Sequence, residues 1–171
     1  MTAATTRTIA CVGCGALVPD VDGPTHRYLG ASPGCWALYG ELLSAESLVR
    51  ELAPMQRLTI NTYAVQHPGV PGPQTKQSLW VHLVGLCLVL ERAQPAGRTK
   101  VLMARLVGTR RAWPWLEPPI PPYPRTILDV RKAHGIDAYD QAVAEWSVST
   151  WMAWLAHQDT IRAVVDELLG V

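Results

Sequence analysis

The sequence predicts a mostly α-helical single domain, a helical bundle with an irregular, zinc-knuckle-like loop module at its N-terminal end. Three observations support this fold class. The chain has 171 residues, 49% of them apolar and 17% charged, which is enough to bury one core without disulfide bonds. Residues 9–29 are rich in Gly, Pro, Asp and Thr, a composition typical of loops with at most very short strands. The segments after residue 35 have the pattern of helices separated by Pro and Gly.

The predicted metal module covers residues 1–35 and the predicted bundle covers residues 36–171. The first helix is expected to begin with Ser32 as N-cap and Pro33 in its first turn, and to end near Glu51. Further helices are expected over 58–66, 75–93, 99–109, 126–133 and 137–169.

Three details refine this expectation. The helix over 75–93 is apolar on all sides after Ser78, which places it in the centre of the bundle. Thr126 and Asp129 have the spacing of a capping pair, and the last helix is expected to break near Asp159. Residues 112–125 are Pro-rich and exclude a helix or an inner strand. They form either a lid across a pocket or a wrapped surface loop.

Charge and hydropathy exclude two classes of partner. Lys and Arg number 15 against 14 Asp and Glu, a net charge of +1, so there is no overall basic field for nucleic acid or an anionic membrane. The most apolar stretch, 79–90, is too short to span a bilayer. Residues 1–10 lack the basic start and apolar run of a secretory signal. We therefore expect a cytoplasmic protein.

The cysteines give the strongest chemical indication. Cys11-Val-Gly-Cys14-Gly is a CxxC motif in which glycines permit the tight turn of a zinc knuckle. Cys35 supplies a third thiolate at the start of a helix, where the helix dipole favours negative sulfur. A redox CxxC is the alternative, but such motifs usually open a helix, and residues 15–19 do not continue as one. Cys87, inside an apolar helix, is expected to be a core thiol.

The fourth zinc ligand is not fixed by spacing alone. The position three residues after Cys35 is Leu38, which cannot bind a metal. The remaining candidates are His26, His67, His82 or water, and we favour His67 because it lies in a Pro/Gly turn at a helix end. A closed Cys3His site would be structural, whereas an open position would permit catalysis.

His26, His82 and Tyr63 are the candidate acid–base residues. His26 lies in a polar loop, where it either acts on a ligand or simply hydrogen-bonds. His82 lies on an apolar helix, where a histidine is often a satisfied core residue. Ser78 shares a helix face with His82. If that face meets the helix that carries Tyr63 and His67, polar groups converge in an apolar bundle and form a small-molecule pocket.

Seven motifs together resemble the DUF5946 family, a bacterial family of unknown function. These are CxxCGA, DGPTHxY, SPGCW, YAVQHPG, SxxxHL, LEPP and EWxxxxWxAWxxH, which run from Cys11 to His157. The resemblance implies that the three cysteines, His26, His67 and His82 occupy the family's motif positions. It also implies an Asp where this chain has Asn61 and a second His where it has Gln158. The resemblance supports the site residues and not a reaction.

Two functions follow from these residues. The first, which the sequence favours slightly, is a zinc-dependent enzyme acting on a small molecule, with histidines moving protons. The second is a non-catalytic ligand- or partner-binding helical domain stabilised by a structural Cys3His zinc. Nucleic-acid binding is a weak third, because Arg105, Arg110 and Arg111 form only a small basic patch.

Overall fold

The computed structural model describes residues 7–171, and this part of the chain is mainly helical, which confirms the predicted fold class. Residues 1–6 lie outside the described part. They belong to the predicted metal module and make up most of the N-terminal stretch in which a secretory signal was not expected. The helices are α1 (Pro33–Leu48), α2 (Gln56–Gln66), α3 (Pro73–Leu90), α4 (Ala96–Gly108), α5 (Ile127–Arg131), α6 (Ile136–Ala153) and α7 (Gln158–Leu169).

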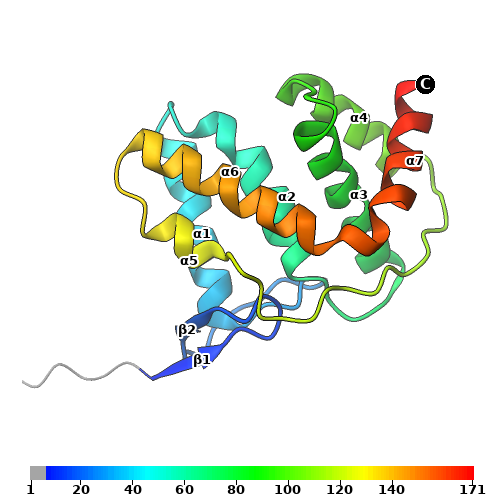
Figure 1. Cartoon of the computed structure of the whole chain (residues 1–171). Coiled ribbons are helices and arrows are strands. Elements are labelled where there is room, and N and C mark those ends of the chain that lie inside the picture. The colour runs from blue at the N-terminus through cyan, green and yellow to red at the C-terminus, as the bar shows by residue number, and fades with distance from the viewer. Residues whose placement is uncertain (1–6) are drawn as a thin grey trace, which may run out of the picture.

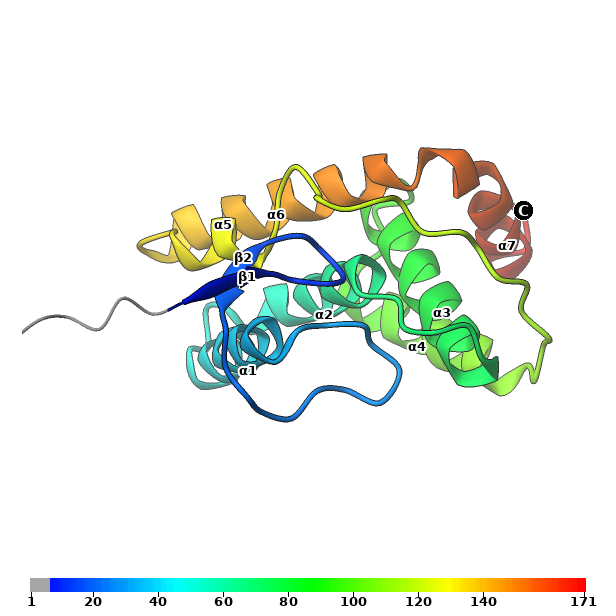
Figure 2. The same cartoon turned by 90° about the horizontal axis from the view of Figure 1, so that it is seen from below.

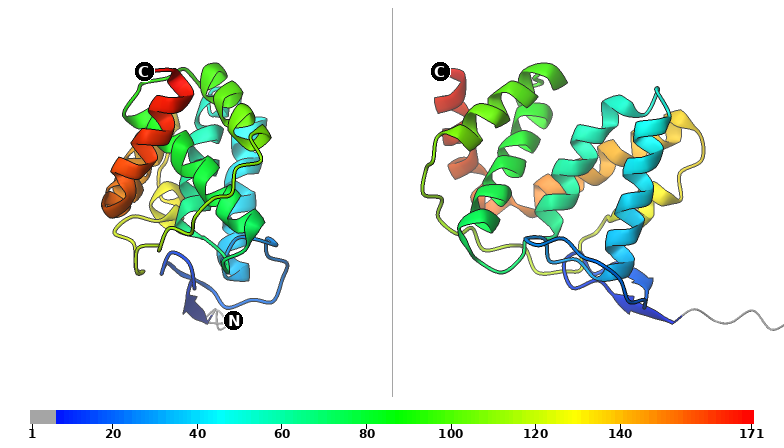
Figure 3. Two further views of the ribbon diagram at one scale, coloured as in Figure 1. Left: turned by 90° about the vertical axis from the view of Figure 1, so that its right-hand side faces the viewer. Right: turned by 180° about the vertical axis from the view of Figure 1, so that it is seen from behind.

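The helices form two groups joined through α2 and α6. Figure 1 shows α6 crossing α2, with α1 and α5 on one side and α3, α4 and α7 on the other. Helix α2 packs against α3 and α6, and α3 packs against α4 and α7. The view from behind in Figure 3 shows α1 beside α2 and α4 beside α3. No helix among residues 7–171 is both long and apolar enough to cross a bilayer.

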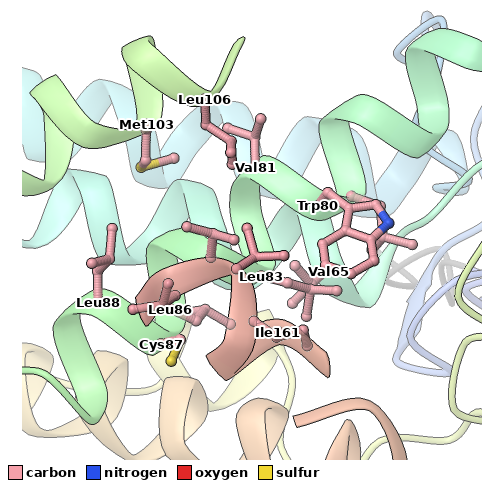
Figure 4. Close-up of a cluster of buried hydrophobic side chains, with 14 of the residues drawn as sticks. Val65, Trp80, Val81, Leu83, Leu86, Cys87, Leu88, Met103, Leu106 and Ile161 are labelled. Atoms are coloured by element: carbon pink, nitrogen blue, oxygen red, sulfur yellow. The ribbon is translucent and has the colours of Figure 1, made fainter. Parts of the chain in front are cut away.

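The side chains form two separate buried clusters. The first, here the apolar core, lies between α3, α4 and α7 and includes Leu83, Leu86 and Ile161, each fully buried. Its side chains interdigitate in Figure 4. The second, here the metal-side core, joins the N-terminal loops to α1, α2, α5 and α6, and it contains Cys11, Cys14 and Cys35. The chain thus buries one apolar interior and one that is rich in sulfur and aromatic rings.

The N-terminal loops and the Pro-rich segment lie against the same end of the bundle. Two very short strands, β1 (Thr8–Ala10) and β2 (Leu17–Pro19), pair antiparallel. Figure 2, which views this end, shows the Pro-rich segment running past the loop between them. The segment is held by buried side chains on either side of its prolines, namely Trp113, Leu116 and Tyr123. Trp113 stacks on Trp80 with ring centroids 4.9 Å apart. The segment therefore packs along the bundle, and a role as a lid across a pocket stays a prediction.

Some helix ends differ from the expectation. Helix α1 begins at Pro33 as predicted, but the Ser32 hydroxyl does not cap it; it accepts a hydrogen bond from the Val12 N–H at 3.1 Å. Helix α1 ends at Leu48 rather than near Glu51, before a 3-10 turn that contains Pro54. The capping box of Thr126 and Asp129 is confirmed.

The long C-terminal helix breaks earlier than predicted. Helix α6 ends at Ala153, and a 3-10 turn (Leu155–His157) leads into α7. The side chain of Gln158 donates to the carbonyl of Trp151 at 2.9 Å, so it satisfies an acceptor at the end of α6. Asp159 caps nothing and instead pairs with Arg162 at 2.7 Å.

Candidate metal centre

Four donor side chains from separate segments meet at one point. Cys11 and Cys14 lie in the turn between β1 and β2, Cys35 in the first turn of α1, and His67 directly after α2. Their ligand atoms all lie within 4.8 Å of one another, and all four residues are buried. None is more than 2% exposed. This Cys3His group could hold a metal ion.

The turn between the first two cysteines is shaped by its glycines. The Gly15 N–H donates to the Cys11 carbonyl at 2.9 Å, and the Cys11 N–H donates to the Ala16 carbonyl at 2.8 Å. Gly15 has φ +79°, a conformation that favours glycine, and a Cβ at Gly13 would lie 2.5 Å from the His67 ring. The backbone therefore folds closely around both sulfurs and leaves His67 room beside them.

Two of the donor spacings match those of a tetrahedral site. Cys14 Sγ lies 3.9 Å from Cys35 Sγ, and Cys35 Sγ lies 3.4 Å from His67 Nε2. Tetrahedral zinc with Zn–S bonds of about 2.3 Å and a Zn–N bond of about 2.0 Å places its donor atoms roughly 3.5 to 3.8 Å apart. Cys14, Cys35 and His67 are therefore already close to the positions that such an ion requires.

Neighbouring groups orient the donors. His67 Nδ1 donates to the Tyr63 carbonyl at 2.7 Å, which turns Nε2 toward the sulfurs. The Tyr63 ring stacks between His67 and Tyr39, with centroids 3.9 Å from each. Its hydroxyl donates to Cys35 Sγ at 3.7 Å, and the Ser32 N–H donates to Cys11 Sγ at 3.5 Å. These contacts form the outer layer that metal sites require.

The sulfurs are too crowded to ionise together without a cation. Hydrogen bonds from Cys14 and Cys35 hold the pKa of Cys11 well below its ordinary value. The same cluster and burial push the pKa of Cys35 well above it. Three adjacent thiolates repel one another, and a divalent ion would neutralise that charge. The chemistry of the donor set therefore fits a thiophilic metal such as zinc.

The buried donors are covered by two other segments of the chain. The Tyr123 N–H donates to the Cys14 carbonyl at 3.0 Å, which holds the Pro-rich segment over the turn. A Cβ at Gly15 would lie 2.7 Å from Pro122, a measure of how tightly that segment covers the turn. On the other side, the Gly30 N–H donates to the His67 carbonyl at 2.9 Å. Four protein donors would supply all four ligands of a tetrahedral ion.

The three residues predicted for acid–base work lie in different places. Tyr63 belongs to the centre itself and is fully buried, and burial raises its pKa. His26 lies outside the Cys3His group, where its Nδ1 accepts from the Tyr28 N–H at 3.3 Å. Its ring packs edge-on against Tyr28 with centroids 4.8 Å apart. A catalytic role for these residues stays a prediction.

His82 also lies outside the group, on α3 facing α2. Its Nδ1 lies 2.9 Å from Asn61 Oδ1, so the imidazole has the buried partner that it needs. Burial, together with the positive charges of Arg57 and His26, lowers the pKa of His82 to about 4. Ser78 and His82 share one face of α3, and α3 packs against α2, the helix that carries Tyr63. On α2 the residue that His82 contacts is Asn61.

Two buried polar residues were not singled out by sequence reasoning. Gln66 donates both to the Arg125 carbonyl and to Thr150 Oγ1 at 2.8 Å, so it ties α2 to α6. Glu46 is fully buried on α1 and accepts from Tyr139 at 2.8 Å, and burial raises its pKa. Gln66 could have been found from the sequence, because it stands beside His67 in the YAVQHPG motif. Nothing in the sequence around Glu46 indicates that it is buried.

The fold and the centre together define a small helical protein with a buried Cys3His group able to hold a metal ion. The chain belongs to the DUF5946 family, described as a family of unknown function, whose model matches residues 9–155. The match includes all four donor residues and ends before α7. No curated protein and no solved structure matches the chain.

Proposed function

We propose that the Cys3His centre binds one structural zinc ion and that the protein is a non-catalytic helical domain that binds a small molecule. One observation carries the first half: four protein donor atoms within 4.8 Å of one another, all buried. Closed four-ligand sites of this kind are structural, whereas catalytic zinc keeps an open position. Zinc bound here would link the loops, α1 and the end of α2.

The zinc-dependent enzyme that the sequence slightly favoured has less support. Three thiolates donate much charge to zinc and weaken it as a Lewis acid. Tyr63 is buried against Cys35 and His67, so it cannot reach a substrate. His26 and His82 are placed away from the four donors, which separates any histidine chemistry from the metal. The non-catalytic alternative therefore fits the geometry better.

The state of the cysteines fits a reducing compartment. All four are free thiols and buried in the structure. Thiolate metal sites persist where disulfides do not form. We therefore propose the cytoplasm as the place where the protein works.

Elemental analysis combined with X-ray absorption at the zinc edge tests this proposal. We expect one zinc per chain with three sulfurs, one imidazole nitrogen and no oxygen. His67→Ala should lose the ion, and His82→Ala should keep it. Cys87→Ser is the matched control, since Cys87 lies in the apolar core and its variant should retain full zinc. An oxygen ligand in the wild type would restore the catalytic alternative, and metal-free protein under reducing, zinc-supplemented conditions would overturn the proposal.

A further inference from the structure

Two surface hollows lie next to each other, beside the loop that carries His26. The first, of about 340 Å³, is lined by Arg27, Tyr28 and residues 72–75. The second, of about 310 Å³, is lined by Tyr28, Gln74, Gln77, Ser78, Val81, His82 and Val107. Both share Tyr28 and Gln74, so they form one groove along the first half of α3. The volume of each is in the range of small-molecule sites.

One end of the groove presents a hydrogen-bond acceptor. The Asn61 side-chain oxygen can only accept, so His82 Nδ1 carries the proton of their 2.9 Å hydrogen bond. The pKa of His82 is lowered to about 4, which keeps the ring neutral near pH 7. Nε2 is then unprotonated, and it has no hydrogen-bond partner among residues 7–171. A ligand with an O–H or N–H group would satisfy it.

The other end is suited to an anion. Helix α3 is 18 residues long, its N-cap Gly72 provides no side-chain cap, and its first turn has no acidic residue. Pro73 has no N–H, so the N–H groups of Gln74 and Thr75 are the ones open to an anion. Thr75 is only 7% exposed and lines the hollow, yet its hydroxyl has no hydrogen bond within the described chain. Arg27 adds a positive charge. Neither hollow is lined by Asp or Glu from residues 7–171.

Between these ends the walls are mixed, because Gln77 and Ser78 add polar groups to an otherwise apolar lining. Val81 and Val107 line the second hollow, and the Tyr28 ring borders both. Thr75 and His82 are seven residues apart on α3, which is about 10 Å along a helix. We propose that this groove binds a small organic anion whose carboxylate or phosphate lies at Arg27 and Thr75 and whose hydroxyl or amide donates to His82 Nε2. The inference rests on the proposed small-molecule binding and names its site and ligand class.

A pair of matched probes tests this proposal. The probe 3-(4-hydroxyphenyl)propanoate carries a carboxylate and a phenol at opposite ends of a flat ring, and 3-phenylpropanoate lacks only the hydroxyl. In NMR titrations of the zinc-loaded protein, both should shift the amides of Gln74 and Thr75. The phenol should bind about fivefold more tightly, the effect of one hydrogen bond, and should shift the ring nitrogens of His82. Inorganic phosphate should compete with both probes if the anion end also accepts phosphate, and should compete with neither if it takes carboxylates alone.

Variants separate the two ends. His82→Gln should abolish the advantage of the phenol and leave binding of 3-phenylpropanoate unchanged. Arg27→Gln should weaken both probes about threefold, as expected for a solvent-exposed charge pair. His134→Ala and Arg98→Gln, which alter exposed residues outside the groove, should change neither.

The outcomes distinguish this inference from the proposed zinc site. Zinc content and thermal unfolding are measured for every variant, and retained zinc with normal unfolding shows that the fold is intact. Absence of saturable shifts in the groove with either probe, in protein that holds its zinc, would overturn the groove while leaving the zinc proposal standing. Equal affinities of the two probes for the wild type would overturn the role of His82. If the wild type holds no zinc but the probes still bind in the groove, the zinc proposal alone fails.

Discussion

The two cores of this molecule are built on different physical principles. The apolar core holds α3, α4 and α7 together with aliphatic and indole side chains such as Leu83, Leu86 and Trp80. The metal-side core holds the N-terminal loops against α1 and α2 with aliphatic side chains as well, but it adds the sulfur and imidazole groups of the Cys3His group and several phenol rings. Both gain stability from apolar area removed from water, and under the proposed function the second gains further stability from a cation that neutralises its donors.

This difference indicates which part of the fold would depend on a metal ion. An apolar core forms from the sequence alone, so α3, α4 and α7 should pack whether or not zinc is present. Residues 9–31 form no long helix and only a two-stranded sheet, so their order depends on the four donors. The comparison predicts that metal removal loosens one half of the molecule and spares the other.

Loss of a zinc ligand should have the largest effect. Cys35→Ser removes a thiolate from a site whose metal binding is worth on the order of 10 kcal/mol in small zinc domains. We expect loss of zinc and destabilisation of the metal-side core by more than about 5 kcal/mol. Hydrogen exchange should show fast exchange in residues 9–31 and α1, with α3 still protected. Equal loss of protection in α3 would show that the two cores are one cooperative unit.

A cavity in the apolar core should give the reverse pattern. Leu83 is fully buried, and Leu→Ala at such a site costs about 3 to 4 kcal/mol. Leu83→Ala should therefore lower the free energy of unfolding in urea by that amount and keep one zinc per chain. Zinc release from this folded variant would contradict the separation of the cores.

Crowding the cysteine turn should have an intermediate effect. In Gly13→Ala the new Cβ would lie 2.4 Å from the Gly30 carbonyl and 2.5 Å from the His67 ring. We expect about 2 kcal/mol of destabilisation and weaker zinc binding in competition with a chelator. Gly40→Ala is the matched control, because a Cβ there meets nothing within 4 Å; it should stabilise α1 by about 0.5 to 1 kcal/mol. Unchanged zinc affinity in Gly13→Ala would mean that His67 has more room than the contacts indicate.

The remaining effect concerns His82 and is seen only as the pH is lowered. Its folded pKa of about 4 lies below the ordinary value of 6.5, so the unfolded chain takes up a proton first as pH falls. The stability due to neutral His82 is complete above the ordinary value and declines toward the folded one. Between pH of about 7 and about 5 the wild type should lose about 2 kcal/mol more than His82→Gln. Parallel pH curves for the two proteins would refute the lowered pKa.

Much of the fold was predictable because its causes are local. Pro33 at a helix start and the pair of Thr126 and Asp129 at another are short-range patterns, and the structure has both. The meeting of the cysteines with His67 could also be anticipated, since thiolates and an imidazole in turns and at helix ends suit one ion. The ligand role of these residues remains for experiment.

What escaped prediction depends on residues far apart in the chain. The position of the break, after Ala153, has no Gly or Pro to mark it, and the Trp151 carbonyl near the end of α6 accepts from the Gln158 side chain. Gln66 and Thr150 meet although 84 positions separate them. The partner of His82 is Asn61 on another helix. Such pairs depend on how the helices pack against one another, and the pattern of apolar residues within one segment does not predict them.

The order of the donors along the chain has a consequence for biosynthesis. Cys11, Cys14, Cys35 and His67 all precede α3, whereas Pro122 and Tyr123, which cover them, come much later. The nascent chain therefore exposes a complete donor set before it has made the cover, and an ion captured then would close two long loops early. Once the Pro-rich segment has docked, exchange of that ion would require the segment to lift. The metal would thus bind while the chain is being synthesised. In the finished protein, slow dissociation as well as high affinity would retain the ion.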